Sequence, residues 1–398
     1  MKKVLLFSML LVAGLILSQY MDVLTGDSVW ARETVRILTM VMLAFIMIHV
    51  GYEFVIDRSR LKSYGFDYLV AATAAAFPWI LCAGYFVLFF FDPDQWGAFD
   101  TWTAALLAGR FAAPTSAGVL FSMLAAAGLS GTWYFRKVRI LAIFDDLDTV
   151  LLMIPLKMLI VGLQWQLAVI LVMMIILLWL AWRYLHRIEI PISWPWVLGY
   201  AGAITLVSEV IYKASKVIND VVPIHIEVLL PAFVLGCVMA YPKGHDPHAD
   251  DSREGHQEGP ESPEEQKVTT IISAAFMVLV GLSMPPIAVG SGSWQIIALH
   301  VVAITALANL GKMFPLLVYR REAHWKERLA ICIGMWPRGE VGAGVLIISL
   351  GYGIGGMMVT VAALSLALNV LLTGVFIVVV KQLLKTVPPV DRHAATGS

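Results

Sequence analysis

The sequence predicts an all-α polytopic membrane protein with about 12 transmembrane helices. Of its 398 residues, 59% are hydrophobic and only 14% are charged, and the mean hydropathy is +0.80. Soluble domains are nearer half apolar and a quarter charged. The additional hydrophobic residues form repeated apolar runs, which reach the ~20 residues that a helix needs to cross a bilayer.

Twelve apolar runs follow one another along the chain. The first follows Lys2 and Lys3 and is as short as a signal peptide, but no small-residue cleavage site comes after it. We therefore expect it to remain as a helix. The predicted spans are about 3–21, 34–56, 67–91, 101–127, 138–160, 165–183, 195–214, 223–241, 268–288, 294–319, 327–350 and 357–381.

The distribution of lysine and arginine supports this count and orients the spans. Positive residues concentrate in the cytoplasmic connections of membrane proteins. With the N-terminus in the cytoplasm, 20 of them fall in inside segments, and the four that fall outside are Arg32, Arg36, Lys213 and Lys216. A single missed span would move many of these residues to the opposite side and remove the asymmetry. The asymmetry therefore supports twelve spans, and with an even number of spans both termini are predicted to be cytoplasmic.

The spans divide the chain into four stretches. Residues 1–241 carry helices 1–8, and residues 268–385 carry helices 9–12. Between them, residues 242–267 are polar and acidic without an apolar anchor, which predicts a disordered cytoplasmic loop. Residues 386–398 are a predicted cytoplasmic tail.

Two spans are interrupted. The fourth contains Pro114 followed by Thr115 and Ser116, and the eleventh contains Pro337 and four glycines. Proline lacks a backbone N–H and disfavours helix at the residue before it. Carbonyl groups freed at membrane depth are tolerated where they line a protein cavity, and there they are good ligands for hard cations.

The two breaks hold equivalent places in two five-span blocks. The first block is residues 1–160, the second is spans 8–12, and linking helices at 165–214 separate them. An odd-numbered block repeated after two intervening helices is necessarily inverted across the membrane. Inverted repeats with interrupted helices are the architecture of secondary transporters, whose site lies at the repeat interface near the midplane.

Charged residues inside the spans are the strongest functional signal. A charge at the bilayer centre costs ~3 kcal/mol or more, so such groups pair with one another or line a wet cavity. The two signs are nearly balanced, as pairing predicts. The cations are Arg110, Lys157, Lys312 and Arg338, and the clearest acids are Asp145, Asp146, Asp148 and Glu340.

Three of these acids lie within four residues of the fifth span. Asp145 and Asp146 point ~100° apart on a helix, so they serve different partners. Asp148 lies on the same side as Asp145. Lys312, deep in the tenth span, needs a carboxylate partner, and Asp145 is our candidate.

Six segments together resemble a known family. The chain is similar to the bacterial sodium/proton antiporters of the monovalent cation:proton antiporter superfamily, in particular the branch with an Asp-Asp pair. The matching segments, in their expected order, are residues 45–57, 106–124, 140–151, 276–284, 311–315 and 334–344.

The resemblance implies a role for each matching residue. Asp146 would bind the cation and the proton alternately. Asp145 would pair with Lys312 and release it when the cation binds. Thr115 and Ser116 would line the site where broken helices 4 and 11 cross at the midplane.

Further residues would brace this crossing or depart from the family pattern. Arg338 and Glu340 would support it by ion pairs. Asp148 stands where the family usually carries an apolar residue, and Arg110 and Lys157 are additional buried cations. Arg110 is a candidate to neutralise Asp148. The alternatives are that Asp148 is a ligand or that Arg110 occupies the site as a tethered cation.

The predicted function is therefore secondary active exchange of a monovalent cation for protons, for pH homeostasis in a bacterial inner membrane. The cation is Na⁺, with Li⁺ as a second candidate, and family members are commonly homodimers that work by alternating access. The alternatives are a K⁺/H⁺ antiporter, a cation channel or a non-transporting ion sensor. We expect no cofactor and no enzymatic activity. The nucleotide-binding pattern GxxxxGK[ST] does not occur, which disfavours ATP-driven pumping, and the Gly-x-Gly-Asp segment typical of intramembrane aspartyl proteases does not occur either. The formal net charge of zero gives no argument for nucleic acid as a partner.

Overall fold

The computed structural model describes most of the chain. The described residues are 2–21, 29–52, 54, 61–129, 132–162, 164–218, 228–240, 263–284, 294–339, 341–343, 346 and 356–387. Among them there are helices and connections but no β-sheet, and the one isolated bridge joins Ile188 to Met239. The all-α prediction is confirmed for this part of the chain.

The helices follow the predicted spans closely. The first half contains α1 (Lys2–Gln19), α3 (Val29–Tyr52), α4 (Leu61–Phe90), η2 (Pro93–Gln95), α5 (Phe99–Gly109), η3 (Arg110–Ala112), α6 (Ala117–Ala126), α7 (Trp133–Val161) and α8 (Trp165–Arg183). The second half contains α9 (Trp194–Ile218), α10 (Leu229–Val238), α11 (Pro263–Leu282), α12 (Trp294–Gly311), α13 (Phe314–Val318), η5 (Tyr319–Arg321), α14 (Trp325–Gly334) and α16 (Met357–Lys385).

Nine helical stretches in the described residues are long and apolar enough to cross a membrane. The other three predicted spans correspond to α7, α10 and α14. α7 is long enough at 29 residues, but it carries the aspartate cluster and several cations, which lower its apolar character. α10 and α14 are each ten residues long. The exceptions are thus a charged helix and two short ones, and the chain agrees with about 12 spans.

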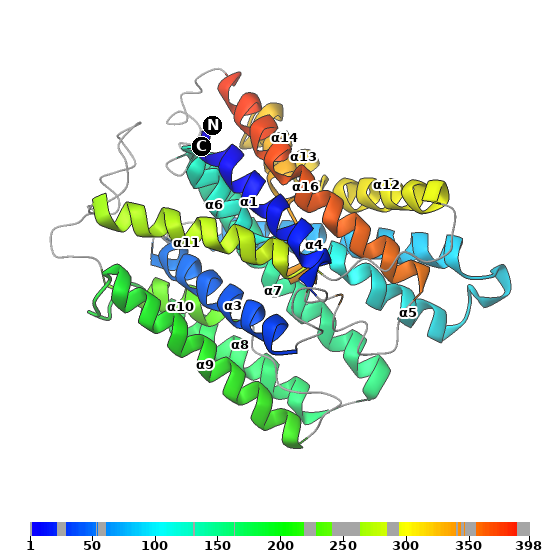
Figure 1. The fold of residues 1–398 in the computed structure, drawn as a ribbon, viewed down its shortest axis with the longest axis horizontal. Coiled ribbons are helices and arrows are strands. Elements are labelled where there is room, and N and C mark those ends of the chain that lie inside the picture. Colours follow the sequence, from blue (N-terminus) through cyan, green and yellow to red (C-terminus); the bar gives the residue numbers. More distant parts are fainter. Residues whose placement is uncertain are drawn as a thin grey trace.

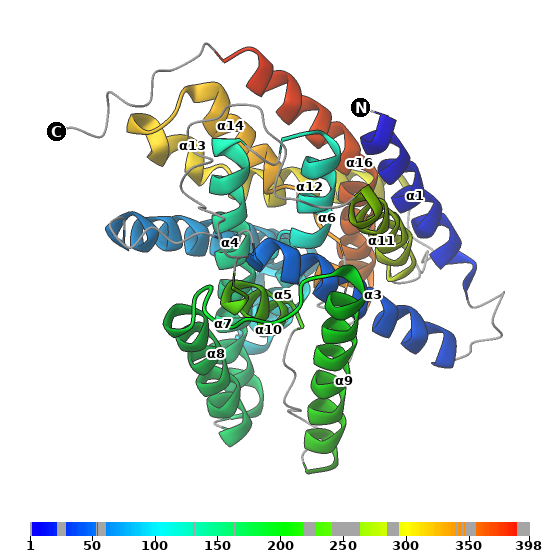
Figure 2. The same cartoon turned by 90° about the vertical axis from the view of Figure 1, so that its left-hand side faces the viewer.

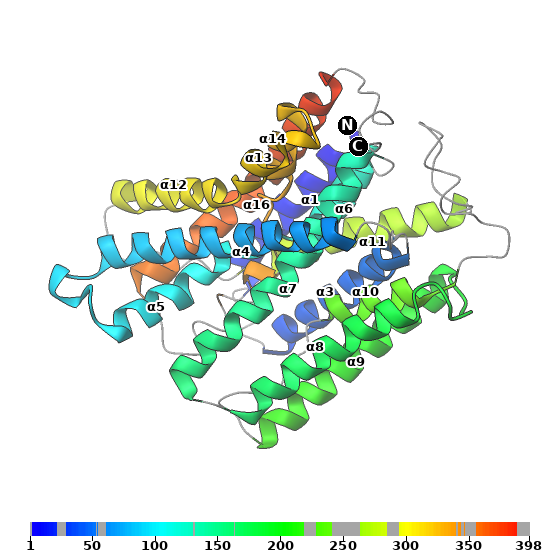
Figure 3. The same ribbon diagram turned by 180° about the vertical axis from the view of Figure 1, so that it is seen from behind.

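The helices form two groups with α1 and α11 between them. In one group α3 packs on α9 and α10, and α10 packs on α8. In the other, α4 packs on α5, α7 and α12, and α16 packs on α12 and α14. Figure 1 shows α8, α9 and α10 along one edge of the molecule, and Figure 2 shows α8 and α9 extending away from α13, α14 and α16. α7 belongs to the second group and runs past α4 towards α8 (Figure 3).

Two glycines allow α3 and α10 to approach unusually closely. A Cβ atom on Gly236 of α10 would lie inside contact distance of the Ile48 carbonyl oxygen of α3. A Cβ atom on Gly51 would meet the Phe233 carbonyl in the same way. Small residues are what lets helix backbones touch within a membrane protein.

Replacing Gly236 with Ala is therefore expected to lower the apparent melting temperature in detergent. The added methyl group meets backbone atoms, which cannot move aside as a side chain can, and overpacking of this kind costs about 1–3 kcal/mol. Gly199→Ala is the matched control, because nothing lies within 4 Å of a Cβ atom at that helical position. Equal melting temperatures for the two variants would show that the α3–α10 contact is looser than described.

The tenth span differs from the prediction of one continuous helix over 294–319. α12 ends at Gly311, and α13 begins at Phe314. Pro315 stands in the first turn of α13, and a proline there cannot donate the hydrogen bond that would continue α12. Gly311 lies directly against the backbone of Pro78 in α4. Lys312 therefore lies at a third helix break.

The predicted acidic loop lies mostly outside the described residues, which resume at Pro263. α11 begins there, so residues 263–267 are helical, although the sequence assigned them to the loop. Their acids, Glu264 and Glu265, stand in the first turn of α11. Carboxylates are favourable at that end of a helix, which explains the earlier start. Of the predicted tail 386–398, only residues 386–387 are described.

Candidate functional site

The two broken spans hydrogen bond to each other at their breaks. Residues 113–116 separate η3 from α6, and residues 336–339 follow the end of α14 without helical structure. The Ser116 amide donates to the Pro337 carbonyl at 2.9 Å. The Thr115 hydroxyl donates to the Met335 carbonyl at 3.1 Å. Each break thus satisfies backbone groups of the other, which is how irregular backbone is tolerated at membrane depth.

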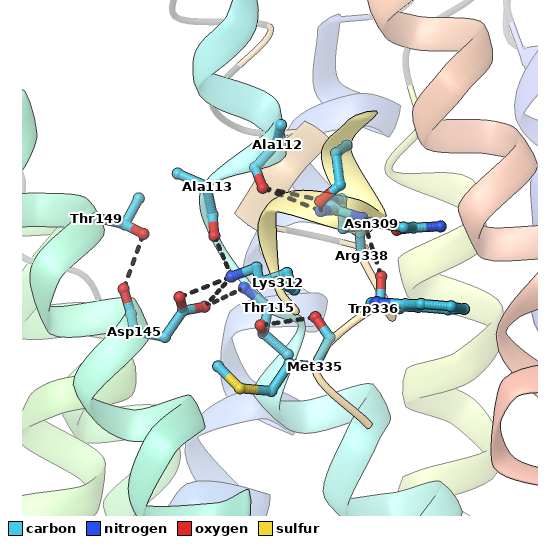
Figure 4. A network of polar contacts seen from close by, with 11 residues as sticks. Ala112, Ala113, Thr115, Asp145, Thr149, Asn309, Lys312, Met335, Trp336 and Arg338 are labelled. Carbon is cyan, nitrogen blue, oxygen red and sulfur yellow. Dashed lines mark hydrogen bonds and ion pairs between the residues drawn. The ribbon is translucent and has the colours of Figure 1, made fainter. Parts of the chain in front are cut away.

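Lys312 lies beside this crossing and forms an ion pair with Asp145. Its Nζ is 2.7 Å from Asp145 Oδ1 and 2.8 Å from Oδ2, and both side chains are fully buried. The ammonium group also donates to the Ala113 carbonyl at 2.5 Å, and the Thr115 amide donates to Asp145 Oδ2 at 2.8 Å. Figure 4 shows Lys312 between the broken helix and Asp145. The pair that the sequence suggested is thus tied to the break itself.

Arg338 holds the crossing from the other side. Its guanidinium group donates to the Ala112 carbonyl at 3.1 and 3.3 Å and to the Ala308 carbonyl at 2.8 Å. It also donates to the side-chain oxygens of Asn309 at 2.7 Å and of Asn369 at 3.3 Å. Arg338 is buried and joins the first half of the broken fourth span to α12 and α16. Glu340, the other residue predicted to brace the crossing, lies outside the described residues.

Asp146 is buried next to Asp145 on α7, with 6% of its surface exposed. Its charge acts on the Lys312 ammonium, as does that of Asp145. Adjacent positions on α7 therefore give two buried carboxylates near one lysine. Asp145 is held by direct hydrogen bonds to that lysine.

Asp148 is also buried, one turn beyond Asp145 on α7. The Tyr68 hydroxyl of α4 forms a hydrogen bond with its carboxyl group. Arg110 donates to the Thr149 carbonyl at 3.2 Å, and the Thr149 hydroxyl donates to the Asp145 carbonyl at 2.9 Å. Arg110 therefore reaches the stretch of α7 that carries Asp145 and Asp148. Neutralisation of Asp148 by Arg110 stays a prediction, and the Lys157 side chain lies outside the described part.

The arrangement suits competition between a small cation and protons. Three carboxylates and three cationic side chains are buried around one crossing. An added cation therefore raises the net charge of this buried site unless another positive charge leaves it. Backbone carbonyls, hydroxyls and carboxylates are oxygen donors of the kind that hard cations prefer. These charged side chains are buried, so the interactions between them are weakly screened.

Sequence reasoning missed Asn309 and Asn369, which complete the Arg338 cradle. Both are buried amides within apolar helices, and polar residues there are rare enough to be a usable signal. The carbonyl groups of Ala112 and Ala113 could not be predicted as part of the site, because they belong to the backbone and no side chain distinguishes these positions. Only their three-dimensional arrangement shows that they face Arg338 and Lys312.

Comparison with protein families decides the broader identity. Residues 3–383 match the family model described as "Sodium/hydrogen exchanger, transmembrane". The chain belongs to this family. The match spans the whole set of helices, including both breaks and the charged crossing of this exchanger. Comparison with curated proteins gives no match.

Family membership makes the chain a polytopic membrane protein that exchanges a cation for protons. It supports the predicted membership of the monovalent cation:proton antiporters. Cation and proton are the substrates of such an exchanger.

Proposed function

We propose that the protein exchanges Na⁺ for protons by alternating access, with Asp146 binding either the cation or a proton. The observation that carries the proposal is a buried lysine–aspartate ion pair at the helix break with a second buried carboxylate beside it. Both carboxylate oxygens of Asp145 accept hydrogen bonds from Lys312, and one accepts a further bond from the Thr115 amide. Asp146 lies next to this pair on α7 and is buried, so it places a second carboxylate at the crossing, and we assign the exchangeable ion to it.

The proposed coupling follows from placing two carboxylates in a poorly solvated site. Like charges so close cannot both stay ionised without positive charge nearby. A proton on Asp146 and the Lys312 ammonium beside Asp145 supply it in the proton-loaded state. A cation entering the site replaces the proton on Asp146, so one ion enters as the other leaves.

Lys312 gives a second route for proton release. The entering cation competes with its ammonium group for the Asp145 oxygens. A lysine that loses its carboxylate partner while buried favours its neutral form. Its proton then leaves together with, or in place of, the proton from Asp146, and the two gradients alone drive the cycle.

The proposal extends to how the protein sits in the membrane. On the lysine and arginine distribution, both termini face the cytoplasm of a bacterial inner membrane. We also propose a homodimer in which the group containing the crossing moves against the group of α3, α9 and α10. The process is transport, with no cofactor and no covalent step.

A pH-gradient dequenching assay in proteoliposomes tests the function. Li⁺, Na⁺, K⁺ and Rb⁺ are added in turn to vesicles that hold an acid interior. We expect Na⁺, and to a lesser degree Li⁺, to collapse the gradient with saturable kinetics. If K⁺ collapses the pH gradient more effectively than Na⁺, the protein is a K⁺/H⁺ antiporter. If the dequenching does not saturate with cation concentration, it is a channel. A gradient that none of the four cations disturbs would contradict exchange.

A further inference from the structure

Asp148 is a buried acid whose carboxyl group uses only part of its hydrogen-bonding capacity. It has 3% of its surface exposed and lies on the stretch of α7 that also carries Asp145. The Tyr68 hydroxyl of α4 forms a hydrogen bond with its carboxyl group. Its Oδ2 atom has no hydrogen-bond partner in the part of the chain that the structure describes. Buried polar atoms are nearly always hydrogen-bonded, so this oxygen calls for an explanation.

Asp148 lies on the same face of α7 as Asp145, which is the ion-pair partner of Lys312. Residues three positions apart on a helix have Cβ atoms about 5–6 Å from each other. The charges of Asp145 and of Lys312 both act on Asp148, so the three groups share one electrostatic environment. A lysine carries its ammonium group on a flexible four-carbon stem. A move of about one helical turn along α7 is within the range of such a side chain.

We infer that Asp148 is a second acceptor for the Lys312 ammonium group, which moves there from Asp145 when the transported cation binds. The inference rests on the proposed exchange, in which the entering cation competes with Lys312 for the Asp145 oxygens. The ammonium group donates to both of those oxygens, so this ion pair and a cation bound to the same oxygens exclude each other. The Oδ2 atom of Asp148 is then the acceptor that receives the displaced lysine.

The energetic reason is that Lys312 is fully buried and cannot turn to water when it leaves Asp145. A buried charge left without its partner is strongly destabilising. Loss of the lysine proton avoids that state, because desolvation favours the neutral amine. A second carboxylate within reach offers another solution, since one ion pair is exchanged for another and the lysine stays charged. The third acid of α7 thus gains a role distinct from those of Asp145 and Asp146.

The exchange of partners also moves a proton. While Lys312 is bound to Asp145, the hydrogen-bond partner of Asp148 is a neutral hydroxyl group, and an ionised carboxylate is costly to bury without a paired cation. Asp148 therefore holds a proton in that arrangement. When the ammonium group arrives, the O–H bond of Asp148 breaks and the proton passes to water on the side to which the site is open. Lys312 keeps its own proton, so the number released is the same as if the lysine had lost it.

Other charged and titratable groups surround this stretch of α7. From α4, the Tyr68 hydroxyl bonds to Asp148. From η3, Arg110 donates to the Thr149 carbonyl at 3.2 Å and brings a positive charge close to α7. On α7 itself, the charge of Asp146 acts on Lys312. These groups are present wherever the lysine lies, so they do not by themselves decide which of the two carboxylates holds it.

Na⁺ binding to the purified full chain in detergent tests the inference through a double-mutant cycle. Calorimetry measures the dissociation constant of the unmodified protein, D148N, K312M and the double variant. We expect D148N to weaken Na⁺ binding about tenfold or more, because the displaced lysine then finds no carboxylate. In the K312M background no ammonium group needs an acceptor, so the same substitution should change binding less than about twofold. D148E, which keeps an acid at this position, should recover part of the loss.

The outcomes of the cycle separate this inference from the proposed function. If D148N weakens binding equally in both backgrounds, Asp148 contacts the cation itself and the inference is wrong. If D148N binds Na⁺ as the unmodified protein does, the inference is wrong as well, while exchange at Asp146 stands. If the dequenching assay shows a preference for K⁺, then K⁺ replaces Na⁺ as the probe. An unmodified protein that binds none of Li⁺, Na⁺, K⁺ and Rb⁺ would contradict the exchange and this inference with it.

A second measurement needs no lysine variant. The infrared difference spectrum between protein with and without Na⁺ should show the loss of protonated carboxyl groups, and D148N should show a smaller loss. Y68F removes the hydroxyl bonded to Asp148 and should shift the frequency of the carboxyl band. Y85F is the matched control, because it removes a hydroxyl from the same helix that bonds to His300 at 2.8 Å. An undiminished carboxyl signal in D148N would overturn the inference even if K312M does not fold.

Discussion

Replacing Asp146 with Asn is expected to reduce cation-dependent proton movement in proteoliposomes to the level of empty vesicles. The amide keeps the size of the carboxylate and one oxygen, so the buried position on α7 stays filled. The asparagine amide does not take up a proton as a carboxylate does, and it has no negative charge to neutralise a cation. Neither the proton nor the cation can therefore bind at this position in exchange for the other. Dequenching after Na⁺ addition measures the result.

Two controls make the outcome interpretable. Asp94→Asn removes an exposed carboxylate in η2, on the connection between α4 and α5, and should transport as the unmodified protein does. An unchanged melting temperature for the Asp146 variant shows that it still folds. Normal transport by that folded variant would remove Asp146 from the mechanism.

Replacing Lys312 with Ala is expected to have the largest effect on stability. The substitution leaves Asp145 buried with no ammonium group beside it, and the Ala113 carbonyl loses its donor. Removing one partner of a buried ion pair typically costs about 3–5 kcal/mol. Thermal unfolding in detergent should therefore show a clear drop in melting temperature, and the coupling between cation and proton movement should be weakened or altered.

The matched control removes both charges. Asp145→Asn keeps an oxygen that can accept the bond from the Thr115 amide, while it removes the negative charge. Combined with Lys312→Met, which preserves the bulk of the lysine chain, it should restore much of the lost stability, because neutral replacement of a buried pair is often tolerated. If the double variant loses as much stability as Asp145→Asn and Lys312→Met lose in sum, the two residues are not energetically coupled.

The sequence predicted the fold well because a bilayer imposes strong rules on composition. Apolar length located the spans, and the ends of α8 at Trp165 and Arg183 agree with the predicted 165–183. Pro114 and Pro337 marked two breaks, because a missing N–H has a direct local effect. The third break, at Lys312, was missed although Pro315 was visible. Its position depends also on the contact between Gly311 and Pro78, which sequence does not show.

The site was predicted only as far as charge reveals it. The cost of a buried charge singled out Lys312 and Asp145 and required a partner for each. The argument from buried charge did not single out Asn309 and Asn369, because they are neutral, and only the weaker signal of a polar residue in an apolar helix marks them. Geometry was needed to show that Arg338 bonds to carbonyls and amides of three separate elements.

Direct observation of competition tests the central claim most closely. Purified protein in a weakly buffered detergent solution is mixed with increasing Na⁺ while the pH is recorded. If one buried carboxylate holds either a proton or the cation, Na⁺ should release protons saturably, and the Asp146→Asn protein should release far fewer. Saturable Na⁺ binding with no proton release from the unmodified protein would contradict the account.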